Sequence, residues 1–459
     1  MNRPGIQARE IAVSLLDQVR VGDATLDRVI AAAQSRIDPL SRPDRALVHA
    51  LVYGVLRWQG RLDWVIDHLT SGSSSKMDPL VRIILRLGVY QIQYLDRIPT
   101  SAVVNTSVDL TRLCRKKWAA GFVNAMLRGL VRRADQIPWP AREGDGQLYL
   151  AIRHAFPTWL IARWMRQWGF DATTRMCQAI NAIPAITLRT NSLKISRCAL
   201  MRQIDAEAKG AQAAVHTPEG IHLTGLQRPL AYWPAYKSGF FQVQAEAAQL
   251  VGHLTAPRPG QRVWDACAGL GTKTAHLAQL MGNRGEIVAT DVRTDKLHAL
   301  RLEMARLSID IVKTERVDLT NPSPKFKPQK FDRILVDAPC SGLGVLQRNP
   351  DGKWRVKEKH LHRNHHRQLA LLSMAAEHLA PDGILVYAVC SLEPEEGENV
   401  VTCFLQKRRE FGIYHAEKQA ALKIEKLLVT SEGCLKTRPY PHGMDGFFAA
   451  AFRRINQQT

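Results

Sequence analysis

The stretch Gln261–Thr274, QRVWDACAGLGTKT, decides the fold of the C-terminal half of the chain. An apolar, strand-like run ends in Asp265, a turn with Gly269 and Gly271 follows, and a helical pattern opens at Lys273. Glycines let a backbone approach a ligand closely, and a helix N-terminus offers free N–H groups. A turn of this kind is also an ordinary strand-to-helix connection, so it does not identify a ligand site by itself.

Strand-like and helical patterns alternate from this stretch onward. The expected strands are QRVWDAC (261–267), GEIVATDV (285–292), DIVKTERVD (310–318), DRILVDAP (332–339), ILVYAVC (384–390) and HGMDGFFAAAFRR (442–454). Regular alternation is typical of an α/β fold with a doubly wound, Rossmann-like sheet. We place this domain at residues 257–456.

Reactive and acidic side chains stand where these strands end. They are Cys267, Asp291, Asp318, Asp337, Cys340 and Cys390. Doubly wound sheets bind ligands at the carboxyl ends of their strands, and an acid placed like Asp291 binds a ribose hydroxyl. Three acids suit a nucleoside cofactor, because carboxylates accept hydrogen bonds from ribose hydroxyls, an adenine amine or an ammonium group. The spacings of a P-loop and of a GxGxxG motif are absent.

Cys340 and Cys390 follow two successive strands, so we expect both thiols to face one cleft. Carbon 5 of a pyrimidine is too weak a nucleophile to take a methyl group directly. A thiolate that adds to carbon 6 turns the ring into an enamine, which attacks an electrophilic methyl group on a sulfonium. A second group then removes the carbon 5 proton so that the thiolate can leave. A lone cysteine is better explained as a small buried apolar residue, but two beside a candidate cofactor loop favour this chemistry.

The first part of the chain is helical, from about Ile6 to Arg133. Apolar residues recur at three- and four-residue spacing, which predicts an all-α bundle at residues 1–136. The Pro- and Gly-rich stretch 137–146 predicts a linker. Residues 147–256 read as two helical segments and a short β-α-β run, a small α/β module that connects to the C-terminal domain.

The end of the bundle carries a basic cluster, which comprises Arg112, Arg115, Lys116, Lys117, Arg128, Arg132 and Arg133. A solvated helix face and an RNA contact explain this cluster about equally well. Over the 459 residues, 63 Lys and Arg exceed 42 Asp and Glu, for a net charge of +21. Such an excess favours a polyanionic partner, with an anionic membrane surface as the other candidate.

Other features of the sequence predict a cytosolic protein. The N-terminus lacks the apolar core of a signal peptide, and no run of 18 uninterrupted apolar residues exists. The eight cysteines form no CxxC pair, which fits reduced thiols better than a zinc ribbon or a disulfide framework. His360, His362, His365 and His366 lie close together, but no acid or cysteine stands at ligand spacing, so a basic helix face on RNA is favoured over a metal site. We expect no membrane, no metal and a monomer.

Four motifs resemble those of the RNA cytosine-5 methyltransferase family: DACAGLGTKT, DAPCSGLG, YAVCSLEPEEGENV and HGMDGFFAA. QRNPDGKW (347–354) and the pair VNTSVDL and GFVNAMLRGLVRR are similar to the branch that acts on 16S ribosomal RNA. In that branch a NusB-like helical RNA-binding domain precedes the catalytic domain. The resemblance covers nearly the whole chain, and the combination of DAPCSG with CSLEPEE is highly specific.

The resemblance implies a role for each matching residue. The loop would bind S-adenosylmethionine through Cys267, Ala268, Gly269, Leu270, Gly271, Thr272 and Lys273. Asp291 would bind the ribose of this cofactor, Asp318 its adenine, and Asp337 would line the methyl-transfer centre. Cys390 would be the nucleophile, and Cys340 would help to release the product. DNA cytosine-5 methyltransferases use a Pro-Cys thiol as nucleophile, so Cys340 is the competing assignment.

The chain departs from the family pattern in the cofactor loop and before Cys390. The family loop reads CAAPGGK, whereas Gly269-Leu270 replaces Ala-Pro here, Thr272 replaces a glycine, and Val389 replaces a common threonine. A side chain at position 272 is expected to crowd the cofactor, so the changes bear on cofactor binding before chemistry. Two other functions stay open: the same reaction on transfer RNA or another ribosomal site, and a non-enzymatic RNA-binding assembly factor.

Overall fold

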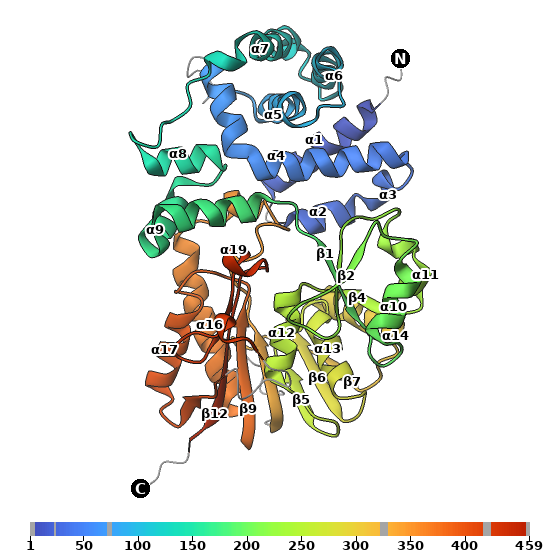
Figure 1. The fold of residues 1–459 in the computed structure, drawn as a ribbon, viewed down its shortest axis with the longest axis vertical. Coiled ribbons are helices and arrows are strands. Elements are labelled where there is room, and N and C mark those ends of the chain that lie inside the picture. The colour runs from blue at the N-terminus through green and yellow to red at the C-terminus, as the bar shows by residue number, and fades with distance from the viewer. Residues whose placement is uncertain (1–4, 23, 71–75, 322–328, 416–423, 456–459) are drawn as a thin grey trace. The chain divides into compact units, whose positions relative to one another are not determined.

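The computed structural model describes residues 5–22, 24–70, 76–321, 329–415 and 424–455, and the chain divides into two compact units (Figure 1). The first comprises Met1–Ala182 and Leu346–Val356, and the second comprises Ile183–Val345 and Lys357–Thr459. The three-part division drawn from the sequence stays a prediction. No helix within the described residues is long and apolar enough to cross a lipid bilayer.

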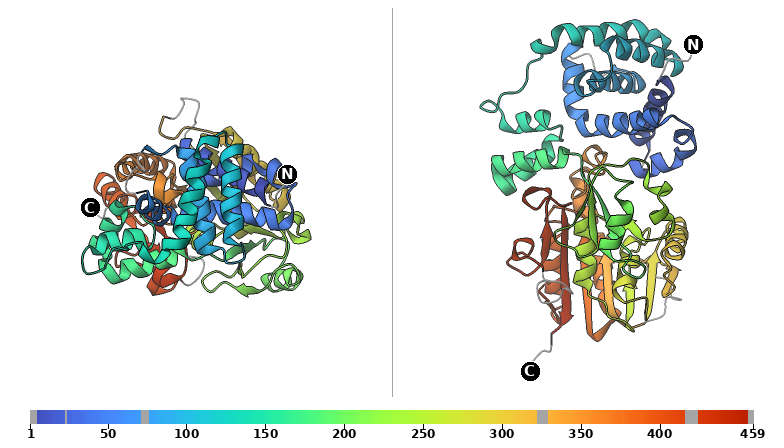
Figure 2. Two further views of the ribbon diagram at one scale, coloured as in Figure 1. Left: turned by 90° about the horizontal axis from the view of Figure 1, so that it is seen from above. Right: turned by 45° about the vertical axis from the view of Figure 1, so that its right-hand side comes forward.

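The first unit is built from helices, as the apolar periodicity predicts (Figure 2). They are α1 (Ile6–Val21), α2 (Leu26–Ala32), α3 (Gln34–Ile37), α4 (Arg42–Leu69), α5 (Pro79–Tyr94), α6 (Thr100–Leu113), α7 (Ala120–Arg133), α8 (Gly146–Arg153), α9 (Thr158–Asn181) and α15 (Gly352–Arg355), with short 3-10 turns η2 (Lys117–Ala119) and η3 (Ala134–Gln136). Side-chain caps start α4 and α5: Ser41 Oγ accepts the Asp44 N–H before α4, and Asp78 accepts the N–H groups of Leu80 and Val81 at the start of α5. The prediction of an all-α N-terminal bundle is confirmed.

The segment Leu346–Val356 belongs to the first unit although it lies far along the chain. Its Lys353 is fully buried. Lys353 Nζ donates to the carbonyls of Arg57 (3.1 Å) and Ala155 (3.3 Å) and to Asn181 Oδ1 (2.6 Å). Burial lowers the pKa of this ammonium well below its usual value. Three acceptors match the three donors of the ammonium, so the segment is anchored without an unsatisfied N–H.

The second unit opens with a small α/β module. It contains β1 (Ile186–Thr190), α10 (Arg197–Ile204), β2 (Ala211–Ala213), β3 (Gly220–Leu223), η4 (Leu230–Tyr232), α11 (Pro234–Lys237) and β4 (Phe241–Val243). Its strands form an antiparallel sheet in the order β2-β3-β1-β4. Leu188 in the central strand pairs with Ile221 on one side and with Val243 on the other. The sequence predicted the module but not β2 or the antiparallel order.

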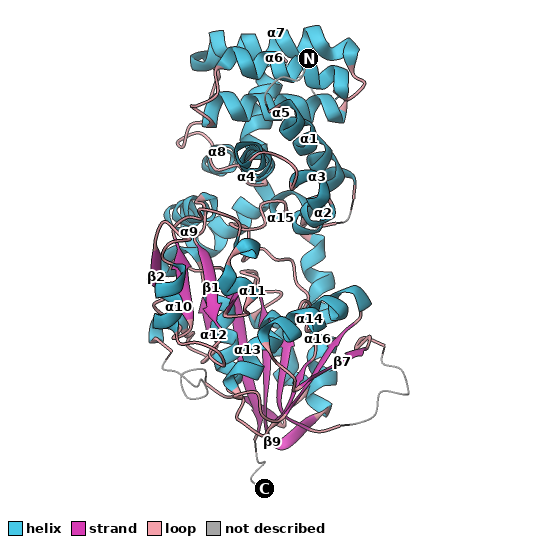
Figure 3. Ribbon diagram, turned by 90° about the vertical axis from the view of Figure 1, so that its right-hand side faces the viewer, coloured by secondary structure: helices cyan, strands magenta, loops and turns pink. Residues whose placement is uncertain are grey.

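An eight-stranded sheet forms the centre of the second unit, with its strands in magenta in Figure 3. The strands are β5 (Arg262–Asp265), β6 (Glu286–Asp291), β7 (Val312–Arg316), β8 (Phe331–Asp337), β9 (Leu379–Val389), β10 (Phe411–Ile413), β11 (Leu435–Thr437) and β12 (Phe447–Arg454). Seven of them run in the order β10-β12-β9-β8-β5-β6-β7, and β11 pairs with β12. Strands β5 to β9 are mutually parallel, and β12 is antiparallel to β9.

Helices cover both faces of this sheet. They are α12 (Glu246–Thr255), α13 (Thr272–Leu280), α14 (Thr294–Leu307), α16 (Lys359–Glu377) and α17 (Glu398–Lys407), and the short η5 (Lys426–Leu428) and α19 (Pro439–His442) lie nearer the C-terminus. Val263 packs in the core formed with α12, α13 and α14, whereas its neighbour Trp264 packs in the core formed with α16 and α17. Alternate residues of a strand point to opposite faces, so both faces are buried. The predicted doubly wound α/β fold is confirmed.

Candidate active site

A cavity of about 570 Å³ lies at the carboxyl ends of β5 to β9. Eleven of the twelve predicted site residues line it: Cys267, Ala268, Gly269, Leu270, Thr272, Lys273, Asp291, Asp318, Asp337, Cys340 and Cys390. Because these residues come from five separate loops, the parallel sheet is what brings them together. Cavities that bind small molecules have volumes of roughly 300–1,000 Å³, so the size suits a nucleoside cofactor.

Gly271, the twelfth residue, does not line the cavity but packs toward the interior. A Cβ at this position would lie 2.5 Å from the Leu300 side chain, and its φ is +82°. Both constraints require glycine. Gly271 therefore shapes the loop rather than facing a ligand.

The Asp291 carboxylate holds the cofactor loop by accepting a hydrogen bond from the backbone of that loop. Its carboxylate accepts the Gly269 N–H at 3.1 Å and the Arg293 N–H at 2.9 Å. The Ala268 N–H donates to the Thr290 carbonyl at 2.9 Å. A carboxylate has about four acceptor positions, so two remain for a ligand hydroxyl.

Lys273 and Asp337 form an ion pair inside the cavity, with 2.7 Å between Nζ and Oδ2. Burial acts to lower the pKa of the Lys273 ammonium, but Asp337 and, after it, Cys390 outweigh that effect, and the pKa is raised. The ammonium is therefore a fixed positive charge near the Cys390 sulfur. Asp265, at the end of β5, accepts the Thr274 hydroxyl at 2.7 Å, and burial raises the pKa of Asp265 to about 7.

The two predicted thiols are neighbours. Cys340 Sγ and Cys390 Sγ are 3.3 Å apart. The pairing of β8 with β9 places Asp337 opposite Ala388, so the two loops that follow leave the sheet side by side. The hydrogen bond with Cys390 and then burial raise the pKa of the Cys340 thiol well above its usual value. Ionisation of the Cys340 thiol is therefore disfavoured in this arrangement.

Three basic residues that the sequence did not single out also line the cavity: Arg293, Lys296 and Arg367. Lys296 Nζ lies 3.7 Å from Asp291 Oδ2, and Arg367 comes from α16 on the other side of the sheet. Lys296 lies in the first turn of α14, the helix that follows Asp291, and a cation so close to the candidate ribose acid in the sequence could have been predicted. Arg367 lies in the histidine-rich segment that we interpreted as an RNA-facing surface.

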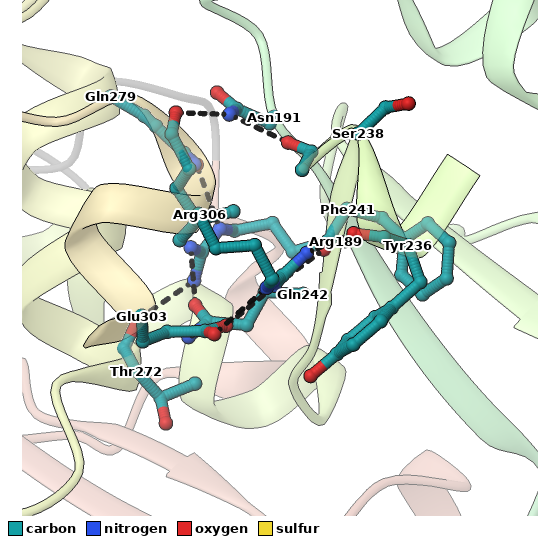
Figure 4. Close-up of polar contacts among 12 residues, drawn as sticks. Arg189, Asn191, Tyr236, Ser238, Phe241, Gln242, Thr272, Gln279, Glu303 and Arg306 are labelled. Atoms are coloured by element: carbon teal, nitrogen blue, oxygen red, sulfur yellow. Dashed lines mark hydrogen bonds and ion pairs between the residues drawn. The ribbon is translucent and has the colours of Figure 1, made fainter. Parts of the chain in front are cut away.

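A buried arginine links the small α/β module to the cofactor loop (Figure 4). Arg189 is 0% exposed and donates to Gln242 (2.8 Å), Gln279 (2.9 Å), Gln244 and the Thr272 carbonyl (2.9 Å). Within the described residues it forms no ion pair, and burial lowers its pKa to about 9. Four neutral acceptors therefore hold a buried guanidinium against the first residue of α13.

The histidines do not assemble as a metal site. Among the described residues, none of the four histidines at 360–366 joins a cluster of three potential ligands, and His365 pairs with the Glu395 carbonyl at 2.9 Å. A different set, Glu219, His253 and His276, has ligand atoms within 4.8 Å of one another. Burial and then the Arg189 charge lower the pKa of His276, and the same positive charge disfavours a second cation there.

The predicted basic cluster lies on the surface of the first unit. Of its seven residues only Lys116, which pairs with Asp78 at 2.6 Å, is partly buried. Arg128 and Arg132 line a groove of about 410 Å³ between α6 and α7. Two aromatic side chains from the same part of the chain are also exposed, Trp118 by 71% and Phe122 by 40%. Basic and aromatic groups together suit RNA.

The chain is similar to known proteins over nearly its whole length. Residues 253–453 match the family described as 16S rRNA methyltransferase RsmB/F, residues 6–132 match the NusB family, and residues 156–228 match the ferredoxin-like domain of RsmF/B-like methyltransferases. A probable ribosomal RNA small subunit methyltransferase B of Synechocystis is 35% identical over 98% of this chain and 100% of its own length. A relative of the same description from Bacillus subtilis is 31% identical over 97% of this chain and 98% of its own. The crystal structure of PH0851 shares the fold, with a TM-score of 0.82 at 23% identity over 99% of this chain and 100% of that one.

Proposed function

We propose that this chain, which belongs to the 16S rRNA methyltransferase RsmB/F family, methylates carbon 5 of a cytosine in 16S ribosomal RNA, at position 967, with S-adenosylmethionine as methyl donor. The observation that carries the proposal is the pair of thiols 3.3 Å apart in a cavity bordered by the cofactor loop. A methyltransferase that acts on carbon 5 needs a thiolate for addition and a different group for elimination, and this pair places a second thiol beside the candidate nucleophile.

The donors around the cavity fit S-adenosylmethionine. The free acceptor positions of Asp291 suit the ribose hydroxyls, and the exposed carboxylate of Asp318 suits the adenine amine. Arg293, Lys296 and Arg367 supply cations for the carboxylate of the amino-acid tail. The cofactor, when bound, supplies an electrophilic methyl group.

Cys390 is the proposed nucleophile. Its thiolate forms a bond to carbon 6, and the electrons of the ring double bond make carbon 5 nucleophilic. After methyl transfer a base removes the carbon 5 proton, the double bond forms again, and the bond between sulfur and carbon 6 breaks. The Cys340 thiol, whose pKa is raised, lies 3.3 Å from the Cys390 sulfur and can donate a hydrogen bond to that sulfur as it departs. Lys273 adds a positive charge near that sulfur.

The first unit is proposed to bind the RNA substrate. Its exposed basic cluster offers contacts to phosphates, and Trp118 and Phe122 offer faces on which unpaired bases stack.

Bisulfite sequencing of ribosomal and transfer RNA from a deletion strain tests the function. We expect one cytosine of 16S RNA to lose its methyl group and to regain it when the intact gene, but not a Cys390→Ala copy, is returned. If a transfer RNA lost its methyl group instead, the substrate would be transfer RNA and not 16S RNA. An unchanged methylation pattern would remove the enzymatic function and favour a binding role in assembly.

A further inference from the structure

Glu396 occupies the centre of a hydrogen-bond network between the two cysteine loops. Its side chain is 0% exposed. Oε1 accepts the Ser341 N–H at 2.7 Å and the side-chain amides of Asn364 at 2.8 Å and Gln368 at 3.3 Å. Oε2 accepts the hydroxyls of Ser341 and of Ser391, the latter at 2.6 Å. No Lys, Arg or His in the described part of the chain forms an ion pair with it.

These contacts reach the residue that follows each cysteine. Ser341 follows Cys340 and Ser391 follows Cys390, so a single carboxylate oxygen joins both loops. Two further bonds fix the acid itself and its surroundings: the Tyr387 hydroxyl donates to the Glu396 carbonyl at 2.5 Å, and Gln368 donates to the Pro339 carbonyl at 3.0 Å. Glu396 therefore links the two cysteine loops at the residue that follows each thiol.

We propose that Glu396 is a positioning residue that holds Cys340 and Cys390 within sulfur-to-sulfur contact. Its catalytic meaning rests on the proposed function, whereas its effect on the two thiols does not. Glu396 touches neither sulfur in this network and acts through Ser341 and Ser391.

The chemistry of the site calls for a carboxylate. All five partners are N–H or O–H donors, and an ionised carboxylate is a pure acceptor with about four positions. Hydrogen bonds to a charged acceptor are roughly twice as strong as neutral ones, which offsets the cost of burying the charge. Glutamine keeps one acceptor oxygen, and the two serine hydroxyls can turn to accept from its amide. Alanine leaves all five donors without this partner.

The thiols themselves report the geometry. Oxidised glutathione converts two neighbouring thiols into one protein disulfide and is reduced to two molecules of glutathione, so two protons and two electrons leave the protein. The equilibrium constant of this exchange measures how closely Cys340 and Cys390 are held. The other six cysteines require that the crosslinked peptide be identified by mass spectrometry.

The experiment compares full-length wild type, Glu396→Ala, Glu396→Gln and Glu398→Gln. Glu398 lies two residues away and pairs with Lys436, so it is the matched control. We expect Glu396→Ala to lower the equilibrium constant for the Cys340–Cys390 disulfide by about tenfold or more. The buried donors of Ser341 and Ser391 lose the acceptor that joins the two cysteine loops, so the thiols are held together less closely. Glu396→Gln should recover most of the loss, and Glu398→Gln should match the wild type. The single-turnover methylation rate should fall in parallel, with the affinity for S-adenosylmethionine unchanged.

An unchanged disulfide constant in folded Glu396→Ala would overturn the proposal. If that variant does not fold, Ser341→Ala combined with Ser391→Ala decides, because it keeps the acid and removes its links to the loops. If the wild type bound S-adenosylmethionine but did not methylate RNA, the proposed function would fail, while the disulfide measurement would still judge Glu396.

Discussion

The choice of nucleophile between Cys340 and Cys390 depends on which thiol can ionise. The hydrogen bond with Cys390 and burial both raise the pKa of Cys340, so Cys340 remains a thiol at neutral pH. A thiolate, not a thiol, attacks carbon 6. The raised pKa counts against Cys340 as the nucleophile, and the resemblance of CSLEPEE to the family motif gives that role to Cys390.

We predict opposite products from the two cysteine variants. Cys390→Ala should form no covalent adduct with RNA and no methylated product. Cys340→Ala should still add and methylate through Cys390 but release the RNA slowly, because the departing sulfur loses its hydrogen-bond donor. The measurement is a shifted protein–RNA band on a denaturing gel after incubation with RNA and S-adenosylmethionine. An adduct trapped by Cys390→Ala alone would assign the nucleophile's role to Cys340.

Asp265 should make stability depend on pH. Its pKa rises from 3.8 to about 7 on folding, so between these values the folded state holds a proton that the unfolded chain has released. Raising the pH through this window therefore lowers the free energy of unfolding. Asp265→Asn has no such proton, and its stability relative to the wild type should grow by roughly 1–3 kcal/mol from about pH 5 to about pH 8.

Urea unfolding at several pH values measures this difference. Asp318→Asn is the control. Asp318 is exposed and the Thr320 hydroxyl lowers its pKa, so this carboxylate is ionised in both the folded and the unfolded chain above pH ~5. The difference in stability between the wild type and Asp318→Asn should therefore stay constant over that range. A difference between wild type and Asp265→Asn that does not change with pH would show that Asp265 is ionised throughout.

At the scale of elements, the start of α13 depends on the small α/β module. Arg189 in β1 donates to the Thr272 carbonyl, where the cofactor loop becomes a helix. We predict that Arg189→Met weakens S-adenosylmethionine binding by about tenfold or more, since the loop and three glutamines lose their shared donor. Arg189→Lys should recover part of the affinity, because an ammonium can still donate to that carbonyl. Isothermal titration calorimetry below the unfolding temperature gives the affinities.

Arg306 provides the control within the same cluster (Figure 4). It donates to the carbonyls of Tyr236 and Phe241 and pairs with Glu303, all outside the cofactor loop. Arg306→Met should lower the melting temperature and leave the affinity for S-adenosylmethionine unchanged. If both variants weakened binding equally, the effect would come from the stability of the module and not from Thr272.

Element-level features were predictable where their signal is local. The apolar runs around Val263 and Ile334 alternate with helical periods, and both became strands of the large sheet. The roles of Glu396 and Arg189 were not predicted, because their hydrogen-bond partners are far away in the sequence. Ser341 lies 55 residues before Glu396, and Thr272 lies 83 residues after Arg189. A buried polar residue in a strand or loop gives no local sign of which donor or acceptor it will meet.

At the scale of the whole molecule, truncation is a poor test of RNA binding. Removing residues 1–136 would take away the carbonyl of Arg57, one of the three acceptors that hold the buried Lys353 of the segment Leu346–Val356. A buried ammonium that loses an acceptor is costly, so the shortened protein would lose stability for reasons unrelated to RNA. Surface substitutions in the full chain avoid this effect.

We therefore predict a position-dependent effect of charge on RNA affinity. Arg128→Ala/Arg132→Ala removes two charges from the groove between α6 and α7, and Arg28→Ala/Arg42→Ala removes two from other exposed positions of the first unit. The affinity for RNA falls with salt in proportion to the number of phosphates contacted, so the groove variant should reduce that slope by about 1 per lost contact. The control should keep the slope of the wild type, measured by filter binding over a range of salt concentrations. Because the chain carries a net charge of +21, weakening alone does not identify a site; equal slopes for the two variants would mean that the groove does not hold the RNA.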